Sequence, residues 1–354
     1  MAKILVTGGA GFIGSHVVDE LIMNGHDVVA LDNLSGGYVE NVNPRAQFVR
    51  GDFCNPKELS TLFQENQFKY VFHLGAYAAE GLSHFIKRFN YQNNLIGSIN
   101  LINASINAGT VRAFVFTSSI AVYGKNQLPM TETMTPSPED PYGIAKLAVE
   151  LELHSSYQFF GLPFIIFRPH NVYGERQNIG DRYRNVIGIF MNQALQNKPF
   201  TIFGDGKQQR AFSYISDVAP IIARSIETQE AYGQTFNIGA DVPCTVNHLA
   251  EAVASAMDIP LNVVHLPARN EVTNAFASHT KAHHYFGHLI KNVPLSEGIT
   301  RMAKWARQLG PQQPTIFKGI EVWKNMPPSW SAGSSGICAK HDANSSDETS
   351  LSRA

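Results

Sequence analysis

Short apolar runs alternate with stretches of helical spacing through the first half of the chain. Runs that are apolar at almost every position are typical of strands buried on both faces. We predict such strands over Lys3–Thr7, Asp27–Leu31, Gln47–Arg50, Tyr70–Leu74, Ala113–Thr117 and Phe164–Arg168. Apolar positions three and four apart predict helices over Phe12–Asn24, Pro56–Gln64, Asn90–Ala108 and Tyr142–Phe160. This alternation predicts an α/β fold with a doubly wound parallel sheet, covered by helices on both faces.

The pattern changes near Arg176, where a long loop to Arg184 precedes shorter elements. We predict strands over Thr201–Phe203 and Ala211–Ile215, and helices over Asn185–Gln196, Asp217–Glu227, Thr245–Met257 and Pro294–Leu309. The mixture predicts a first domain at 1–175 and a smaller α+β substrate-binding lobe at 176–310. In the C-terminal extension at 311–354 we expect a structural role for the apolar patch Phe317–Trp323. Beyond residue 330, the abundance of Ser, Ala, Gly and Asp predicts disorder.

A glycine-rich turn separates the first predicted strand from the first predicted helix. Gly8, Gly11 and Gly14 follow the strand directly. Glycine lets the backbone turn tightly and approach a pyrophosphate, and the start of the helix offers N–H groups to phosphates. Asp32 follows the second predicted strand, close to the spacing of a carboxylate that binds the adenosine ribose. This context predicts a dinucleotide site, and a glycine turn in another kind of α/β protein is the structural alternative.

Composition restricts the partners of this protein. The 354 residues include 28 Lys and Arg and 29 Asp and Glu, so the formal net charge of −1 gives no reason to expect nucleic acid or a membrane as partner. The 3 cysteines are far apart, which argues against a disulfide framework and is typical of a reducing compartment. Neither a signal peptide nor an apolar run of membrane-spanning length is evident, so we expect a cytoplasmic protein.

Chemically active side chains follow the predicted strand Ala113–Thr117. Ser119 lies just past its carboxyl end, while Tyr142 and Lys146 share one face of the next predicted helix. With a pKa of about 10, tyrosine is a poor base at neutral pH, but a nearby ammonium group and an oxidised nicotinamide favour the phenolate. The phenolate can take a proton from an alcohol while hydride leaves the same carbon, and Ser119 can hold that hydroxyl. An exposed helix pair is the alternative interpretation.

Together these motifs resemble the extended short-chain dehydrogenase/reductases, specifically the NAD-dependent nucleotide-sugar epimerase/dehydratase family. The resemblance covers Met1 to about Leu309 and is strongest to UDP-hexose 4-epimerases. The matching motifs are Thr7–Gly14, Asp32–Leu34, Gly51–Asp52, His73–Ala76, Asn94 with Gly97, Thr117–Ser119, Tyr142 with Lys146, Arg168–Gly174 and Asn237–Gly239. The resemblance implies a Rossmann-type sheet, a bound NAD and a homodimer formed through the two long predicted helices.

The resemblance also implies roles for individual residues. Ser119, Tyr142 and Lys146 would be catalytic. NAD would contact Gly8, Gly11, Phe12, Ile13, Gly14, Asp32, Asn33, Ser35, Asp52, Phe53, Leu74, Gly75, Ala76, Asn94, Thr117, Tyr142 and Lys146. A nucleotide-diphosphate sugar would contact Ser119, Asn171, Asn185, Arg210 and Arg269. The carboxylate of Asp32 favours NAD over NADP because it would repel a 2′-phosphate.

Ile120 and Ala121 distinguish among the reactions of the family. The 4,6-dehydratases carry Asp-Glu at these positions and the uronic-acid decarboxylases carry Glu at the second, whereas neither side chain here can move a proton. The cysteine of the epimerase-reductases is missing too, since none lies between Cys54 and Cys244. We therefore predict a 4-epimerase of UDP-glucose and UDP-galactose that works through a transient 4-keto sugar. The alternatives are a UDP-glucuronate 4-epimerase, another nucleotide-sugar dehydratase or reductase of the family, and a non-catalytic NAD-binding protein, the last being the least favoured.

The expected substrate arginines suit a diphosphate, because arginine binds phosphate oxygens bidentately. Surface salt bridges are the alternative for each of them. The family's usual acid after Arg210 is replaced by Ala211, which leaves the local hydrogen bonding open.

Three further groups of side chains lack a firm assignment. Tyr77, Glu80 and His84 are unusual for the family and stand where a sugar substituent would be read. Arg176, Arg182 and Arg184 raise the possibility of a uronic acid, although we favour solvated loop arginines. His279, His283, His284 and His288 have helical spacing, and we favour a plain polar helix face over a metal site.

Overall fold

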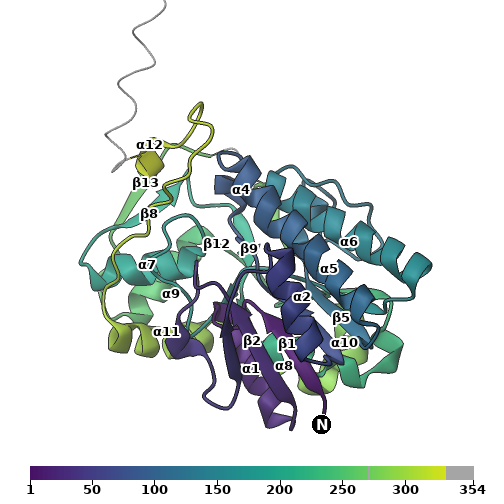
Figure 1. The fold of residues 1–354 in the computed structure, drawn as a ribbon. Coiled ribbons are helices and arrows are strands. Elements are labelled where there is room, and N and C mark those ends of the chain that lie inside the picture. Colours follow the sequence, from purple (N-terminus) through teal and green to yellow (C-terminus); the bar gives the residue numbers. More distant parts are fainter. Residues whose placement is uncertain (270–271, 332–354) are drawn as a thin grey trace, which may run out of the picture.

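The computed structural model describes residues 1–269 and 272–331. Its centre is a 7-stranded parallel sheet in the order β11-β6-β5-β4-β1-β2-β3 (Figure 1). The strands are β1 (Lys3–Thr7), β2 (Asp27–Asp32), β3 (Gln47–Arg50), β4 (Tyr70–His73), β5 (Ala113–Thr117), β6 (Phe164–Pro169) and β11 (Gln234–Ile238). The predicted fold class is confirmed. Because the strand order reverses between β1 and β4, a crevice opens at their carboxyl ends.

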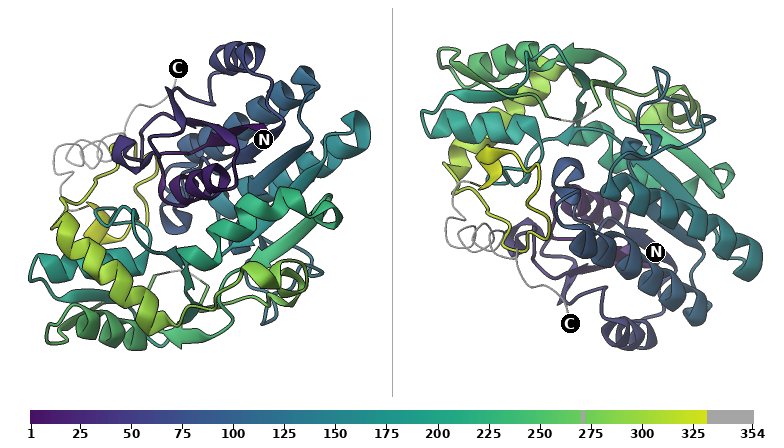
Figure 2. Two further views of the ribbon diagram at one scale, coloured as in Figure 1. Left: turned by 90° about the horizontal axis from the view of Figure 1, so that it is seen from below. Right: turned by 90° about the horizontal axis from the view of Figure 1, so that it is seen from above.

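The sheet separates two apolar cores. In β1, Ile4 and Val6 belong to one cluster of buried residues and Leu5 to the other, because successive side chains of a strand point to opposite faces. On the Leu5 face lie α2 (Pro56–Glu65), α5 (Gly97–Ala108) and α6 (Pro141–Phe160). The other face is covered by α1 (Phe12–Met23) and α8 (Ala219–Arg224) (Figure 2). The near-continuous apolar strands of the sequence reflect this double covering.

The strand β11 was not predicted. It comes from the region expected to form the smaller lobe, yet it pairs with β6 along its full length, from Gln234 opposite Ile165 to Ile238 opposite Pro169. The main sheet therefore does not end at residue 175. Short strands with mixed polarity, such as Gln234–Ile238, carry little periodicity of their own, so only their long-range pairing reveals them.

The helix predicted over Asn90–Ala108 is longer and less regular than expected. It begins as α4 (Lys87–Tyr91), continues through a π-helical turn at Gln92–Ile96 and ends as α5. A short helix that was not predicted, α3 (Glu80–Ser83), precedes it. Single π-helical turns are frequent at functional sites, and this one lies beside the cleft described below.

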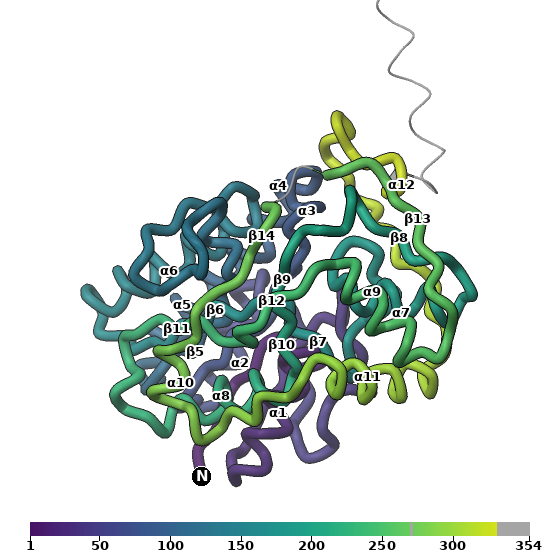
Figure 3. The backbone as a smooth tube through the Cα atoms, turned by 180° about the vertical axis from the view of Figure 1, so that it is seen from behind, coloured from purple at the N-terminus to yellow at the C-terminus, as the bar shows by residue number. Residues whose placement is uncertain are grey.

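In the described part of the chain, the second lobe contains three small sheets and three α-helices (Figure 3). The strands are β7 (Val172–Tyr173) with β10 (Ser213–Tyr214), β9 (Gln209–Ala211) with β12 (Pro243–Thr245) and β14 (Asn274–Ala275), and β8 (Phe200–Phe203) with β13 (Val263–Leu266). The helices are α7 (Val186–Leu195), α9 (Val246–Ala256) and α11 (Leu295–Leu309), whereas α10 (Thr280–Phe286) packs against β11 of the main sheet.

After α11 the chain returns to the sheet domain. It passes α4 and ends in the short helix α12 (Pro328–Ser331) (Figure 1). The patch Phe317–Trp323 packs there, since Phe317 and Ile320 contact a buried cluster around Trp330. The disorder predicted beyond residue 330 begins at Ser331, which belongs to α12, and otherwise concerns residues 332–354, which lie outside the described residues. Among the described helices, none has the length and apolar character that crossing a membrane requires.

Candidate active site

A cavity of about 1280 Å³ opens at the carboxyl ends of the sheet strands and extends to the second lobe. Most of the predicted site residues line it. They are Gly8, Gly11, Phe12, Ile13, Gly14, Asp32, Asn33, Ser35, Phe53, Leu74, Gly75, Ala76, Thr117, Ser119, Tyr142, Lys146, Asn171, Asn185, Arg210 and Arg269. The cleft therefore brings together side chains from both halves of the sequence. Such crevices are where α/β sheets bind their ligands.

The glycine turn after β1 is tightly packed. Gly8 has a φ of +70°, and a Cβ there would lie 2.7 Å from the backbone nitrogen of Gly75, in the loop after β4. A Cβ at Gly14 would lie 1.9 Å from the carbonyl oxygen of Gly8. Any side chain at either position would push the turn apart. Helix α1 then starts at Gly11 without a side-chain cap, which leaves its first N–H groups to an anionic ligand.

The predicted ribose carboxylate faces the same cleft. Asp32 accepts hydrogen bonds from the backbone N–H groups of Ala10, at 3.1 Å, and Leu34, at 2.7 Å, which fix its orientation. Burial raises the pKa of Asp32, and these backbone bonds oppose that rise. A carboxylate has about four acceptor positions, so Asp32 can still accept from a hydroxyl.

Two buried hydroxyls at the carboxyl end of β5 lack a partner among the described residues. They are those of Thr117, the last residue of the strand, and Ser118, the residue after it, and both line the cleft. Buried polar groups are almost always satisfied, so orphaned ones in a cleft point to a polar ligand. Together with the unobstructed glycine turn and the held carboxylate of Asp32, they fit a bound dinucleotide.

Asp52 and Asn94 do not line the cleft, unlike the other predicted cofactor residues. Asp52 instead accepts from the backbone N–H of Cys54 at 2.8 Å and from the side chain of Asn33 at 3.4 Å. The Asn94 amide binds both backbone groups of Tyr77, at 2.8 and 3.0 Å. Both residues therefore hold cleft-lining residues in place from behind, a distinction that sequence spacing does not reveal.

The predicted catalytic residues converge on one point of the cleft. Helix α6 starts with Pro141, and Asp140 caps it by accepting from the N–H of Gly143 at 2.9 Å. Tyr142 and Lys146 are thereby placed one turn apart. Ser119 is hydrogen bonded to the Tyr142 side chain, and the side-chain nitrogen of Lys146 lies 5.7 Å from the centre of the Tyr142 ring.

Lys146 is almost completely enclosed. Its side-chain nitrogen donates to the backbone oxygen of Thr117 at 2.8 Å and lies 4.7 Å from the ring centre of Phe116. Burial lowers the pKa of Lys146 to about 7, although the carboxylate of Glu150 opposes this shift. Burial also raises the pKa of Tyr142, as does the carboxylate of Glu80, while the hydrogen bond from Ser119 lowers it. Without a ligand, the site therefore keeps Tyr142 protonated.

A buried ion pair anchors the helix behind these residues. Glu150, one turn past Lys146, accepts from Nε of Arg168 at 2.9 Å and also binds a terminal nitrogen of the same guanidinium. The other terminal nitrogen of Arg168 donates to the Tyr123 hydroxyl at 2.7 Å, and that hydroxyl donates to Asn237 at 2.8 Å. This network ties α6 to β6 and β11.

The expected substrate residues lie toward the second lobe. Arg210 donates to the backbone oxygens of Gln209, at 2.9 Å, and Thr273, at 2.7 Å, which fixes its guanidinium in the cleft wall. Asn171 donates to the carbonyl oxygen of Ala211 at 3.1 Å.

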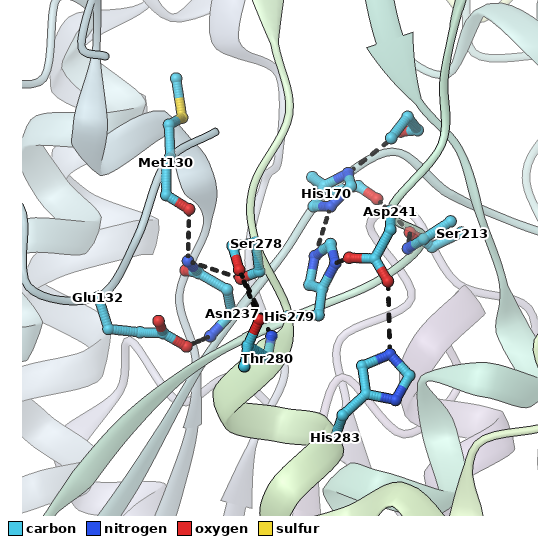
Figure 4. Close-up of polar contacts among 12 residues, drawn as sticks. Met130, Glu132, His170, Ser213, Asn237, Asp241, Ser278, His279, Thr280 and His283 are labelled. Atoms are coloured by element: carbon cyan, nitrogen blue, oxygen red, sulfur yellow. Dashed lines mark hydrogen bonds and ion pairs between the residues drawn. The ribbon is translucent and has the colours of Figure 1, made fainter. Parts of the chain in front are cut away.

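The prediction of a plain polar helix face is wrong for His279, which is only 1% exposed. It lies between Asp241, with Nδ1 2.6 Å from a carboxylate oxygen, and the cleft-lining His170, with the two Nε2 atoms 2.8 Å apart (Figure 4). His170 is held in turn by the carbonyl oxygen of Ala211 at 3.1 Å. His283 is 3.4 Å from the other oxygen of Asp241. No group suited to a metal ion is found in the described part of the chain.

Two of the three loop arginines form ion pairs, which contradicts the preference for solvated side chains at these positions. Arg176 binds Asp19 at 2.7 Å, and Arg184 binds Asp181 at 2.6 Å while lying 5.2 Å from the ring centre of Tyr77. Of the three, only Arg184 lines the cleft.

Sequence reasoning also missed part of the cleft wall. Residues 324–330 of the C-terminal extension line the cavity without having been predicted to, whereas Glu80 and His84, which the sequence had singled out beside the sugar, line it as well. The one available signal for the former was an apolar tryptophan at the end of a proline-rich stretch.

A Rossmann-type sheet whose glycine turn faces a Ser-Tyr-Lys set defines a short-chain dehydrogenase/reductase. The chain belongs to the NAD dependent epimerase/dehydratase family, whose model matches residues 4–239. Its cofactor is therefore NAD.

Known relatives resemble almost the whole of the two lobes. A putative UDP-glucose 4-epimerase of Methanocaldococcus jannaschii is 33% identical over 306 residues, which cover 86% of this chain and 98% of the relative. The crystal structure of a UDP-glucose 4-epimerase from Thermotoga maritima with UDP-glucose is 36% identical, with a TM-score of 0.81 over 87% of this chain and 99% of that one. A UDP-glucuronic acid 4-epimerase from Bacillus cereus, solved with UDP-glucuronic acid and NAD, is 31% identical, with a TM-score of 0.79 and coverages of 87% and 99%.

Proposed function

We propose that this protein is an NAD-dependent 4-epimerase of a UDP-sugar of the UDP-glucose and UDP-galactose type. The observation that carries the proposal is the convergence of Ser119, Tyr142 and Lys146 beside Ile120 and Ala121, which also line the cleft. The two aliphatic residues offer neither acid nor base next to the reacting sugar, so an elimination step has no support from these positions. The relatives named as UDP-glucose 4-epimerases support the same conclusion.

In this mechanism Tyr142 moves the proton at the sugar's O4. When bound, NAD would supply the acceptor and donor of the hydride at C4 and, when oxidised, a positive charge that favours the phenolate. Ser119, which is hydrogen bonded to Tyr142, orients the O4 hydroxyl of the sugar. The proton of this hydroxyl then passes to the phenolate oxygen of Tyr142. The ammonium charge of Lys146 stabilises the phenolate. A hydrogen bond to the carbonyl oxygen of Thr117 holds this ammonium group in position. The resulting 4-keto sugar turns in the cleft, and Tyr142 returns the proton when the other face is reduced.

Arg210 and Arg269 are proposed to hold the diphosphate while the keto sugar turns. Both line the second-lobe side of the cleft, and a guanidinium group binds phosphate oxygens in a fixed geometry. A fixed diphosphate keeps the intermediate bound while only the sugar moves.

A substrate panel tests the proposal. Purified protein is given UDP-glucose, UDP-galactose, UDP-glucuronate and UDP-N-acetylglucosamine, and the products are separated by chromatography. We expect interconversion of UDP-glucose and UDP-galactose. Formation of a 4-keto-6-deoxy sugar without epimerisation of any substrate would contradict it.

A UDP-glucuronate 4-epimerase is the second candidate. The Arg184 guanidinium, 19% exposed at the cleft wall, is a cation that a C6 carboxylate could meet. Its ion pair with Asp181 argues against this role, because the carboxylate already neutralises it. Faster turnover of the uronic acid than of the neutral sugar would favour this candidate.

A further inference from the structure

Residues 311–331, which we call the C-terminal segment, lie beyond the range 4–239 that the family model matches. The relative from Methanocaldococcus jannaschii is matched over 98% of its length by 86% of this chain, so part of this chain has no counterpart there. The C-terminal segment nevertheless forms a wall of the cleft. Its contribution to the site therefore has to be derived from this structure.

The C-terminal segment is fixed to both lobes. On the second lobe, the backbone N–H of Gln312 donates to the Asn192 side chain at 2.8 Å, and that side chain donates back to the Gln312 carbonyl at 2.9 Å. On the sheet domain, the Glu321 carboxylate accepts from the backbone N–H groups of Arg88, at 2.9 Å, and Phe89, at 3.0 Å. These groups belong to the first turn of α4, which an anionic side chain stabilises. Hydrogen bonds at both ends therefore hold the C-terminal segment against the two lobes, beside the cleft that it lines.

Trp330 ends the segment inside the cleft wall. It is 5% exposed, and its ring centre lies 5.4 Å from that of Tyr183 and 6.2 Å from that of Phe85. A Cβ at Gly81 would lie 3.0 Å from the edge of the indole, so the absence of a side chain on α3 makes room for this ring. Burial on this scale restricts the indole to one position.

The Arg269 guanidinium lies next to this ring. Its central carbon is 5.4 Å from the ring centre of Trp330 and 3.9 Å from that of Phe203, and all three residues line the cleft. Phe203 ends β8 in the second lobe, whereas Trp330 is supplied by the C-terminal segment. Aromatic faces attract a guanidinium by its charge, and they restrict its rotation.

We propose that Trp330 is a positioning residue for Arg269, through which the C-terminal segment completes the diphosphate-binding end of the cleft. The inference rests on the proposed function only in assigning a nucleoside diphosphate group to Arg269. A guanidinium held between ordered rings loses less conformational freedom when it binds phosphate oxygens, so the ligand is bound more tightly. Trp330 has no proposed role in the proton transfer at Tyr142, so its loss should affect binding more than chemistry.

The test compares full-length Trp330→Leu and Trp330→Phe proteins, which keep an apolar side chain but differ in having an aromatic face. Binding of UDP is measured by calorimetry, together with KM and kcat for the sugar that the wild type converts. A cation–π contact of about 1–2 kcal/mol predicts roughly tenfold weaker UDP binding and a similar rise in KM for Trp330→Leu, with kcat within about twofold. Trp330→Phe should retain UDP affinity within about threefold. Trp323→Ala, at a tryptophan of the same segment that is 40% exposed, should bind UDP like the wild type.

A double-mutant cycle shows whether Trp330 acts through Arg269. In an Arg269→Met background, Trp330→Leu should cause no further loss of UDP affinity. The inference would be overturned if Trp330→Leu lost the same UDP affinity in both backgrounds, or if it kept the wild-type affinity for UDP. It would also be overturned if Trp330→Leu and Trp330→Phe weakened UDP binding equally, or if the wild type did not bind UDP. A wild type that binds UDP but epimerises no sugar would overturn the proposed function alone.

Discussion

Burial governs the chemistry of the individual catalytic side chains. Lys146 is 2% exposed, and burial lowers its pKa to about 7, while burial raises the pKa of Tyr142. A low-dielectric site disfavours both the ammonium and the phenolate. The reactive phenolate therefore depends on charge brought by the ligand, which couples proton transfer to an occupied site.

Replacing Tyr142 with Phe tests the proposed proton transfer. We expect kcat to fall by about 10²–10⁴-fold, because general acid–base catalysis contributes that much, while bound NAD measured by absorbance stays unchanged. Tyr157→Phe removes a hydroxyl from the same helix at a half-exposed position and should leave kcat unaltered. Near-normal turnover by Tyr142→Phe would exclude this residue as the base.

At the scale of elements, the functional side chains of α6 recur once per helical turn. Tyr142 and Lys146 face the cleft, and Glu150 continues the same line to Arg168 on β6. The side chains of this pair are 3% and 6% exposed. Because the charges are desolvated, removing one partner leaves the other uncompensated. The ion pair thus fixes both the rotation of the helix and the place of the catalytic residues.

Glu150→Gln should lower the free energy of unfolding by about 3–5 kcal/mol, the range for breaking a buried pair. Urea denaturation at neutral pH measures it. Glu152→Gln, on the same helix, keeps an oxygen for its hydrogen bond from Ser156 and should stay within about 0.5 kcal/mol of the wild type. A Glu150→Gln protein as stable as this control would show that the pair contributes nothing.

At the scale of the whole molecule, α6 leaves an apolar outer face. Its exposed members are Ile144, Leu151, Tyr157, Phe159 and Phe160, with exposures of 42–82%. By the helical period, Ile144, Leu151 and Phe159 share one side of α6. Exposed apolar residues grouped in this way are typical of an interface, which supports the homodimer expected from the family resemblance.

Light scattering should give about twice the 39.0 kDa of one chain. A charge at the centre of this face, as in Leu151→Glu, should shift the protein toward the monomer because the charge would be buried without a partner. Leu261→Glu, at a leucine that is 47% exposed outside α6, serves as the control. A wild-type monomer at micromolar concentration would refute the dimer.

Buried histidines make the stability of the whole molecule depend on pH. Burial lowers the pKa of His73 and of His170 to about 3, from an ordinary value of 6.5. Between these values the unfolded chain binds more protons than the folded one, so stability falls as the pH falls below about 6.5.

Urea unfolding between pH 6.5 and 4.5 should show that the free energy of unfolding changes by up to about 1.4 kcal/mol per pH unit for each histidine. His73→Asn should reduce the slope, whereas His248→Asn, at an exposed site, should not; equal slopes in all three proteins would contradict the prediction.

The sequence alone determined the features that depend on local pattern. Buried parallel strands require continuous apolar runs, and the turn at Gly8 and Gly14 tolerates no side chain, so both are visible in the order of residues. The spacing of Tyr142 and Lys146 follows from the geometry of one helix. These features sufficed for the fold class and the family.

Only the tertiary structure decided which residues meet across long distances in the chain. The pairing of β11 with β6, the burial of His279 between His170 and Asp241, and the contact of Trp330 with Arg269 leave no periodic signal. Each depends on packing between segments that are far apart in sequence. The neighbouring segment determines both whether a side chain is buried and whether its charge is neutralised. Long-range packing also decides that Asp52 and Asn94 lie behind the cleft wall, whereas the other predicted cofactor residues line it.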